Sequence, residues 1–538
     1  MIKAAVLTPA TIIDQAVRRA VPRLNGWSES ESALPALVVE RTGNPEHGDY
    51  SVTLPLKLAK VLRRAPVQIA NELAPLIELD ESFAAISVAA PGFINLRLKP
   101  VWLQAQVEPI AAAGPEWGRS ELGKGMRTQV EYVSSNPTGP LLFSHGRGAV
   151  VGDVVARILE ASGYSVQREY YLNDMGRQIR LLGESILARM RGESPPEGGY
   201  SGDYVTEIAD EAKRQGVAAD ANLLADFGIK AVMAGITRDL DRLRIRHDNW
   251  FSESSLYQGL SEETLQALRA KGRVAEKDGA VWFVTGSDKD EVLIRRDGYP
   301  TYFASDIFYH RDKLEKRGFE RVVDVWGADH QGQVGRLKQA LEVLGMDPSR
   351  LLVLLVQLVS VKRGGEVVRM SRRAGVGISL EEMLDEVGPD AVRYFFLLRS
   401  ADAHMEFDVD LAKRQSNDNP VYYAQYAHAR LANVLSFGSA ASGEPVYSRL
   451  DSEWELELIR VMVRWPDIVR EAADALEPHR LAFYTDELAA AIHRFYKNCR
   501  IVSDDAALTA ARLQLARAAK TTLTNAFGLM GVSAPDRM

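Results

Sequence analysis

The chain has 538 residues, of which 46% are hydrophobic and 25% are charged, with a formal net charge of −7. This length exceeds a single hydrophobic core, so roughly three or more domains are expected. A single cysteine, Cys499, excludes a disulfide-built secreted scaffold and fits a reducing cytoplasm. No apolar run reaches the roughly 20 residues that a membrane helix needs, so we expect no membrane partner.

Residues 1 to about 115 predict a compact α+β domain. Turn-forming residues gather at Pro45–Thr53, which suits a tight loop as well as a functional motif. Periodicity predicts helices at 11–24 and 56–73 and strands at 36–40, 84–90 and 92–98.

Residues from about 120 to 400 predict an α/β domain with a Rossmann-type parallel sheet, interrupted by an insertion at about 180–290. Strand–helix–strand units place their strands in parallel, and two such units suit one nucleotide-binding sheet. The predicted strands lie at 128–134, 165–172, 321–325 and 351–361, and the helices between them at 150–159 and 331–344.

Helical patterns dominate the rest of the chain, so residues 401–538 predict an all-helical C-terminal domain. Just before it, Ser379 and Glu382 form a capping box that predicts the start of another helix.

Two segments have the chemistry of phosphate binding. His145–Gly148 lies where a strand, a loop and a helix N-terminus meet, so free N–H groups and the helix dipole attract an anion there. The glycines allow close backbone approach, and Arg147 adds positive charge. The second segment, Arg369–Arg373, is a basic run next to glycines, although most such runs are solvated surface.

Longer blocks follow one another along nearly the whole chain. They read NPTGP (136–140), HGRGAVVGD (145–153), GYSVQREYYLNDMGRQI (163–179), GYPTYFASDIFYHRDK (298–313), DVWGADHQGQ (324–333), EVVRMSRRAG (366–375), NDNPVYYAQYAHAR (417–430) and GVSAPDRM (531–538). The sequences and the order of these blocks resemble those of the arginyl-tRNA synthetases, a family of class I aminoacyl-tRNA synthetases. The family's HIGH-like signature is altered to Leu142-Phe143-Ser144-His145, and its KMSKS signature carries arginine at 369 and 372.

The resemblance implies a ligase that activates arginine with ATP and transfers it to the 3′ end of tRNA(Arg), as a cytoplasmic monomer. ATP would enter with Mg²⁺ as a substrate, and neither a prosthetic group nor a dedicated metal site is expected. The implied catalytic residues are His145, Arg369 and Arg372, and the implied ATP-binding residues are His145, Gly146, Gly148, Asp153, Met370 and Ser371. The implied arginine-binding residues are Glu131, Asn136, Tyr302, Asp306 and His330.

The RNA side of this interpretation rests on both end domains. The resemblance implies that the N-terminal domain contacts tRNA. In the C-terminal helices, the mixture of aromatic and basic residues also favours contact with RNA. A stripe of this kind is also common in helix cores. The implied tRNA-binding residues are Tyr422, Tyr426, His428, Arg430 and Arg494.

The altered signature leaves a second hypothesis open, a catalytically weakened or regulatory tRNA-binding paralogue. The side chain of Leu142 cannot donate a hydrogen bond, and Ser144 replaces a glycine that lies under the adenine ring in the family. Tyr302 and Asp306 are four residues apart and share a face on a helix, which suits an arginine pocket. Alternatively, Tyr302 is a core residue and Asp306 caps a helix. A retained pocket favours the active ligase, because an inactive enzyme has no physical need for it.

Overall fold

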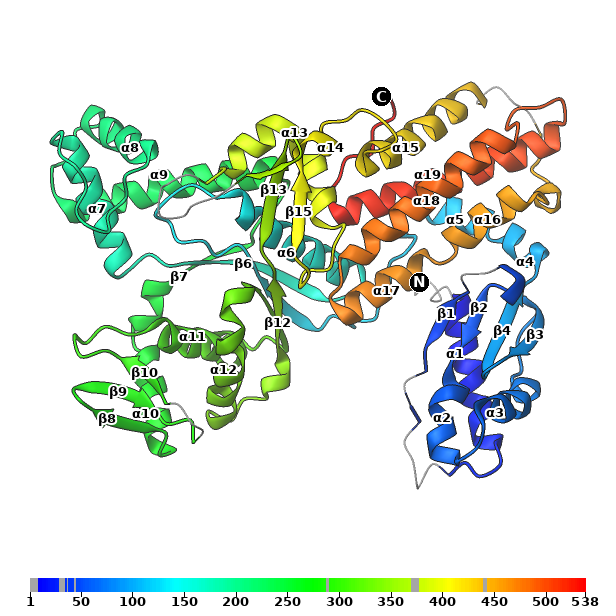
Figure 1. Ribbon diagram of the computed structural model, residues 1–538, viewed down its shortest axis with the longest axis horizontal. Helices are drawn as coiled ribbons and strands as arrows, with labels where there is room; N and C mark the ends of the chain where they lie inside the picture. Colours follow the sequence, from blue (N-terminus) through cyan, green and yellow to red (C-terminus); the bar gives the residue numbers. More distant parts are fainter. Residues whose placement is uncertain are drawn as a thin grey trace.

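The computed structural model describes residues 8–28, 34–35, 37–42, 45–286, 290–368, 377–438 and 443–538. Figure 1 shows a central sheet, a bundle of C-terminal helices on one side of it, and an N-terminal domain below that bundle. Two smaller lobes extend from the other side of the sheet. These parts confirm the predicted fold class.

The N-terminal domain contains a four-stranded antiparallel sheet in the order β1-β2-β4-β3. The helical pattern at 56–73 forms two helices, because Arg63 ends the first in a left-handed conformation (φ 53°) and Pro66 begins the second. Part of the predicted loop Pro45–Thr53 is strand β2. The elements are α1 (Pro9–Ala20), β1 (Val39–Arg41), β2 (Tyr50–Val52), α2 (Leu54–Leu62), α3 (Pro66–Leu73), β3 (Phe83–Ala89), β4 (Phe93–Leu98), α4 (Pro100–Ala105) and α5 (Val107–Ala113).

The central sheet has five parallel strands in the order β12-β11-β5-β6-β7. The chain passes from β5 to β6 in one direction along the sheet and from β11 to β12 in the other, so the strand order reverses between β5 and β11. Open α/β sheets bind ligands outside the carboxyl ends of their strands at such a point. The elements are β5 (Arg127–Glu131), α6 (Phe143–Ala161), β6 (Ser165–Leu172), β7 (Asn249–Ser252), β11 (Arg321–Gly327), α12 (Gln331–Val343) and β12 (Leu351–Val356).

The apolar run at 351–361 forms two strands in different sheets, so the prediction of one strand was wrong. After β12 the chain turns at Gln357, whose N–H donates to the carbonyl of Ala401 at 2.8 Å. The next strand, β13 (Val359–Arg363), pairs with β14 (Glu366–Val368) and with β15 (Met405–Asp408). The apolar residues of β12 continue through Val359 and Val361 of β13, so hydrophobicity alone did not mark the turn between the two strands.

The segment at about 180–290 contains a strand of the central sheet, β7, with a segment outside the sheet on either side of it. These two outside segments form the two lobes at the left of Figure 1. The first comprises α7 (Arg177–Met190), α8 (Asp203–Arg214) and α9 (Ala221–Arg242). The second comprises α10 (Leu260–Ala270), β8 (Val274–Lys277), β9 (Ala280–Phe283) and β10 (Glu291–Ile294), followed by α11 (Tyr302–Arg311).

Parts of the N-terminal region pack against the C-terminal bundle. Helix α5 packs against α19. The N-terminal sheet is held to the bundle by ion pairs from Asp49 to Arg460 and from Arg41 to Glu457, each at 2.7 Å. The helices after the central sheet are α13 (Leu380–Phe396), α14 (Val409–Ala412), α15 (Pro420–Phe437), α16 (Glu453–Met462), α17 (Trp465–Ala475), α18 (His479–Asn498) and α19 (Ala506–Met530).

A buried ion pair joins the first crossover helix to the end of the chain. Asp153 on α6 accepts a hydrogen bond from Arg157 Nε at 2.8 Å and pairs with Arg393 on α13. Arg393 is fully buried and donates to the carbonyls of Leu243 at 2.6 Å and Met530 at 2.7 Å. One guanidinium thus holds α6 and α13 against the ends of α9 and α19.

We expect Arg393→Met to lower the free energy of unfolding by about 3–5 kcal/mol, because Asp153 would lose its buried partner. Urea unfolding followed by circular dichroism measures the change. Arg480→Met is the matched control, since its partners Glu471 and Glu477 are exposed and the loss should stay below about 1 kcal/mol. Equal losses in the two variants would contradict this account.

Candidate active site

Helix α6 begins at the carboxyl edge of the sheet, after the loop that leaves β5. Its N-cap residue, Leu142, is extended (φ −78°, ψ 153°), and its N–H donates to Nδ1 of His145 at 3.2 Å. Because Nδ1 accepts, the neutral imidazole carries its hydrogen on Nε2. His145 therefore supplies an N–H donor in the first turn of a helix, where an anion is favoured.

The residues that follow the second signature lie directly against the first. Phe143 N–H donates to the carbonyl of Ile378 at 2.9 Å, and Leu380 N–H donates to that of Leu141 at 2.8 Å. A side chain at Gly377 would approach Leu142 Cδ2 to 2.9 Å. The substituted Leu142 thus packs against Gly377, in the segment that follows the second signature. The second signature's predicted residues, Arg369, Met370, Ser371 and Arg372, lie outside the described residues.

The two predicted glycines of the phosphate loop have different surroundings. A Cβ at Gly146 would lie 3.1 Å from Leu380 and 3.2 Å from Phe396, so this glycine allows α6 and α13 to pack closely. A Cβ at Gly148 would meet no atom within 4 Å. Gly148 therefore faces open space, whereas Gly146 is buried.

Two polar residues near this loop face the interior of the protein. Arg147, expected to add charge for phosphate, is fully buried and donates to the carbonyls of Gln357, Ser400 and Ala403 at 2.8–2.9 Å. Burial lowers the pKa of Arg147 to about 10. Asp153, predicted to bind ATP, is equally buried in its pair with arginine, so the structure brings neither side chain to the open side of the loop.

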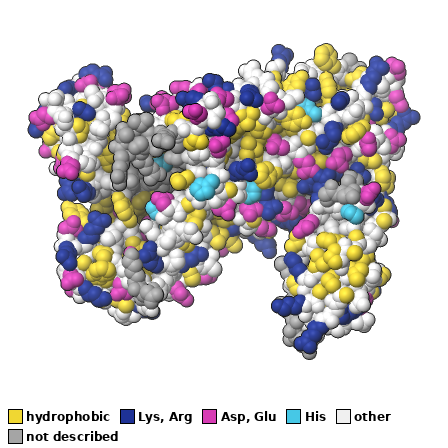
Figure 2. Space-filling model, viewed as in Figure 1, with side chains coloured by type: hydrophobic (Ala, Val, Ile, Leu, Met, Phe, Trp, Pro, Cys, Tyr) yellow, Lys and Arg dark blue, Asp and Glu magenta, His cyan; other side chains and the backbone are white. Residues whose placement is uncertain are grey.

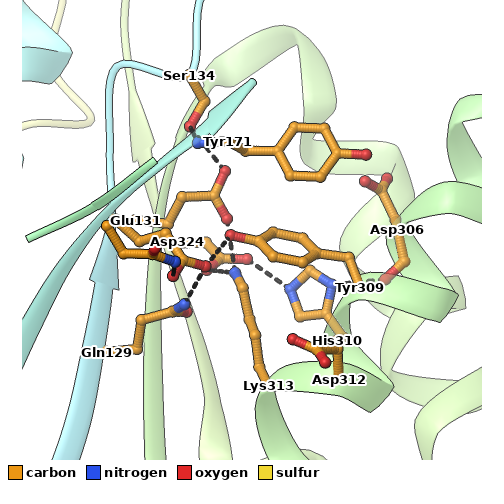
Figure 3. A network of polar contacts seen from close by, with 12 residues as sticks. Gln129, Glu131, Ser134, Tyr171, Asp306, Tyr309, His310, Asp312, Lys313 and Asp324 are labelled. Atoms are coloured by element: carbon orange, nitrogen blue, oxygen red, sulfur yellow. Dashed lines mark hydrogen bonds and ion pairs between the residues drawn. The ribbon is translucent and has the colours of Figure 1, made fainter. Parts of the chain in front are cut away.

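A network of buried charges lies between β5, β11 and α11 (Figure 3). Glu131 and Asp324 are register partners on adjacent parallel strands. Lys313 Nζ lies 2.6 Å from Glu131 Oε2 and 2.9 Å from Asp324 Oδ1. On its other side, Asp324 Oδ2 lies 2.6 Å from His310 Nε2. The predicted residue Glu131 is thus one member of a cluster that the sequence did not reveal.

Near this network, the buried carboxylate of Glu169 on β6 accepts hydrogen bonds from several elements. It accepts hydrogen bonds from the hydroxyl of Tyr309 at 2.5 Å and from both terminal nitrogens of Arg317 at 2.6 and 2.8 Å. Gln129 and Asn249 complete its shell at 2.5 and 2.6 Å. These contacts fix α11 and the turn after it against the sheet.

Asp306 and Tyr302 lie on α11 as predicted, and they differ in exposure. Tyr302 is 54% exposed, whereas Asp306 is partly buried and its carboxylate has no hydrogen bond or ion pair within the described part of the chain. Burial raises the pKa of Asp306 to about 7, with His310 opposing and Glu131 adding to the shift. Figure 3 shows its carboxylate directed away from Lys313, toward the hydroxyl end of Tyr171. An uncompensated carboxyl of this kind favours a cationic ligand.

Two further predicted residues lie on the rim, one after each strand of the switch point. Asn136 is exposed in the loop after β5 and donates to Gln178 Oε1 at 2.9 Å. His330 follows β11, with Nδ1 3.5 Å from Gln333 Oε1 and its side chain 50% exposed. Both are therefore accessible from the carboxyl edge of the sheet.

Aromatic and basic residues form a second candidate surface on α15 and α18. The rings of Tyr422 and Tyr426 stack at 6.1 Å, and the Arg430 guanidinium lies 4.3 Å above the ring of Tyr426. Arg430 also contacts His493 at 3.0 Å, one residue from the predicted Arg494. Because these side chains are only partly buried, they suit stacking on unpaired bases.

The remaining predicted residue of this surface, His428, lies elsewhere. It is buried, with Nδ1 2.8 Å from the carbonyl of Pro535 and Nε2 3.0 Å from Thr524 Oγ1. These contacts hold the last residues of the chain against α15 and α19. His428 is thus placed as a structural residue, apart from the other predicted RNA contacts.

Within the described residues, no cluster of three or more His, Cys, Asp or Glu side chains is arranged to hold a metal ion. Within the same ranges, no helix combines the length and apolarity that a membrane span requires.

Family models match three consecutive parts of the chain. Residues 9–98 match the arginyl tRNA synthetase N terminal domain, residues 116–195 and 220–404 match the catalytic domain of class I (R) tRNA synthetases, and residues 424–538 match the DALR anticodon binding domain. The unmatched stretch between 195 and 220 falls in the lobe formed by α7, α8 and α9.

Full-length relatives agree with these matches. The chain is 42% identical to an arginine–tRNA ligase of Dehalococcoides mccartyi, over 99% of this chain and 100% of that protein. It is 44% identical to one from Geobacter sp. over 94% and 95% of the two chains. The structure of the Thermus thermophilus arginyl-tRNA synthetase has a TM-score of 0.80 and 21% identity, covering 98% of this chain and all of that one, a likeness of fold.

The unpaired Asp306 predicts a pH-dependent stability. Its folded pKa of about 7 lies above the ordinary value of 3.8, so the stability it contributes at low pH is lost as the pH rises through 7. Asp306→Asn should therefore stabilise the ligand-free chain at pH 8 by roughly 1–3 kcal/mol, and much less at pH 5. Urea unfolding at both pH values measures this. The exposed Asp226→Asn is the control, and a gain that is the same at both pH values would contradict the prediction.

Proposed function

The chain belongs to the arginyl-tRNA synthetase family and ligates arginine to tRNA with ATP, and we propose how its residues divide that work. The observation that carries the proposal is the unpaired carboxyl of Asp306 next to a buried network of paired side chains at the switch point of the sheet. Arginine is the amino acid whose side chain is a permanent, forked cation, and a carboxylate meets it with two parallel hydrogen bonds.

In the proposed arginine site, Asp306 receives the guanidinium and Tyr302 covers it from the exposed side of α11. Glu131 and Asn136 lie at the end of β5 and bind the α-ammonium and carboxyl ends. His330 borders the site from β11. This arrangement places the substrate across the carboxyl ends of the two strands where the sheet order reverses.

In the proposed activation step, the phosphates of ATP lie at the N-terminus of α6. There His145 donates through Nε2–H, and Gly148 leaves space for the phosphate chain. Arg369 and Arg372 supply charge to the departing pyrophosphate, and Mg²⁺ arrives with ATP. The carboxylate of arginine attacks the α-phosphate and pyrophosphate leaves. No covalent enzyme intermediate is needed, because positioning and charge stabilisation lower the barrier.

In the proposed transfer step, tRNA(Arg) docks on the stacked tyrosines of α15, with Arg430 and Arg494 nearby. The 2′-hydroxyl of its terminal adenosine attacks the arginyl carbonyl, and AMP leaves. We further propose that the enzyme works as a monomer in the cytoplasm.

Arginine-dependent exchange of pyrophosphate into ATP, with and without tRNA(Arg), tests this proposal. We expect exchange that depends on arginine. Tight tRNA binding without exchange under either condition would instead support a regulatory paralogue, the hypothesis that the substitution at Leu142 raises.

Leu142→His should raise the rate of arginine activation about tenfold or more, since a positioned donor at transition-state charge is worth about 2.7–4 kcal/mol. The exchange assay at saturating ATP and arginine measures the rate. Leu142→Ala is the control, because it relieves the packing on Gly377 without adding a donor. An unchanged rate in the histidine variant would mean that His145 alone serves the phosphate.

Tyr426→Ala should weaken tRNA(Arg) binding by roughly 1–3 kcal/mol, the value of one base stacked on an aromatic ring. Filter binding at fixed salt measures the dissociation constant. Tyr447→Phe, a change outside α15 and α18, is the control. Loss of affinity in the control, or none in Tyr426→Ala, would remove this helix face from the RNA interface.

A further inference from the structure

Lys313 reaches the network through an unusual turn. After α11 the chain continues as a π-helical segment, η6 (Asp312–Lys316), and such segments are frequent at functional sites. The side chain of Lys313 runs toward the sheet and is fully buried, a rare position for lysine unless it is paired (Figure 3). Burial opposes its charge, yet the carboxylates of Asp324 and Glu131 raise the pKa of Lys313. It is therefore a buried cation.

The two carboxylates depend on this cation to different degrees. Asp324 has a second partner, His310, whose Nε2 lies 2.6 Å away and whose Nδ1 faces the carbonyl of Asp306 at 2.7 Å. Glu131 has Lys313 as its one ion-pair partner within the described residues. The removal of Lys313 would therefore affect Glu131 first, and a buried carboxylate without a counter-charge takes up a proton.

The Glu131 carboxylate is fixed from two sides. Lys313 holds Oε2, while Oε1 accepts from Ser134 Oγ at 2.8 Å. Ser134 is itself held, because its Oγ accepts from the N–H of Tyr171 at 3.1 Å. Val133 and Ser134 both have positive φ (71° and 39°), a tight turn that brings the hydroxyl back over the end of β5.

We infer that Lys313 is a positioning residue for arginine, which keeps Glu131 ionised and fixes its carboxylate toward the α-ammonium group without touching the substrate itself. The inference rests on the proposed contact between Glu131 and that ammonium group. The same pair of contacts predicts an effect on arginine and none on ATP, because the phosphate-binding start of α6 contains no part of the network.

The test measures KM for arginine and for ATP in the full-length chain, by pyrophosphate exchange with tRNA(Arg) present, from pH 6 to 8.5. Lys313→Met should raise KM for arginine at least about tenfold at pH 7 and change KM for ATP less than about twofold. Asp306 titrates in both proteins, so the readout is the ratio of the variant's arginine KM to the wild-type value, which should fall as the pH rises and Glu131 ionises. Lys313→Arg, which keeps the charge, should recover most of the affinity. Equal rises of both KM values, or a ratio that does not change with pH, would overturn the inference.

A double-mutant cycle with Glu131→Gln separates positioning from a general structural role. If Lys313 acts through Glu131, Lys313→Met adds nothing to the arginine KM in the Glu131→Gln background. A further rise by the full single-variant factor would overturn the inference. The double variant leaves no unpaired charge between these two positions, so it carries the test even where Lys313→Met alone does not fold.

The cycle also distinguishes this inference from the proposed function. Absence of arginine-dependent exchange in the wild-type chain would refute the function. A normal arginine KM in Glu131→Gln, with wild-type exchange intact, would refute only the ammonium contact and the positioning role that depends on it.

Discussion

Two neighbouring carboxylates impose the constraint on which this site depends. The parallel register of β5 and β11 sets Glu131 opposite Asp324, in an interior where like charges repel strongly. Lys313 lies between them and His310 holds the far side of Asp324. The buried lysine and the histidine both follow from placing two acids where the strand order reverses, and the π-helical turn that carries the lysine lies beside them.

Periodic and local signals were enough to predict much of the fold. Helix α12 and strand β6 lie within about one residue of their predicted ranges, and the capping box at Ser379 begins α13 as expected. The cluster around Lys313 could not be predicted in this way, because a charged residue in a sequence window gives no sign of a partner on another element. Asp324 is the exception: it lies between valines in an apolar strand, where a charge is buried only when it is paired, so the sequence indicated a partner without identifying it.

Helix geometry explains why two residues predicted to bind a ligand face the interior of the protein. Successive residues advance about 100° around a helix, so residues two apart point roughly 200° apart. Arg147 therefore faces away from His145, and His428 faces away from Tyr426, as their buried hydrogen bonds show. Tyr422, Tyr426 and Arg430, spaced by four, share a face. Residue type alone predicts one surface for His428 and Tyr426, whereas their spacing along the helix places them on different faces.

The pairing of side chains within the network also separates the recognition of arginine from its activation. With Lys313 and His310 set against Glu131 and Asp324, the partly buried carboxyl of Asp306 is the group left without a partner in the described residues. A monocation completes this arrangement, whereas a neutral side chain of equal length would leave the carboxyl buried and unpaired, at a cost of roughly 5- to 160-fold in binding, about 1–3 kcal/mol. The substituted Leu142 lies on the other side of the switch point, at the start of α6. It lies in the proposed phosphate half of the site, so a change in the rate of activation there leaves the selection of arginine intact.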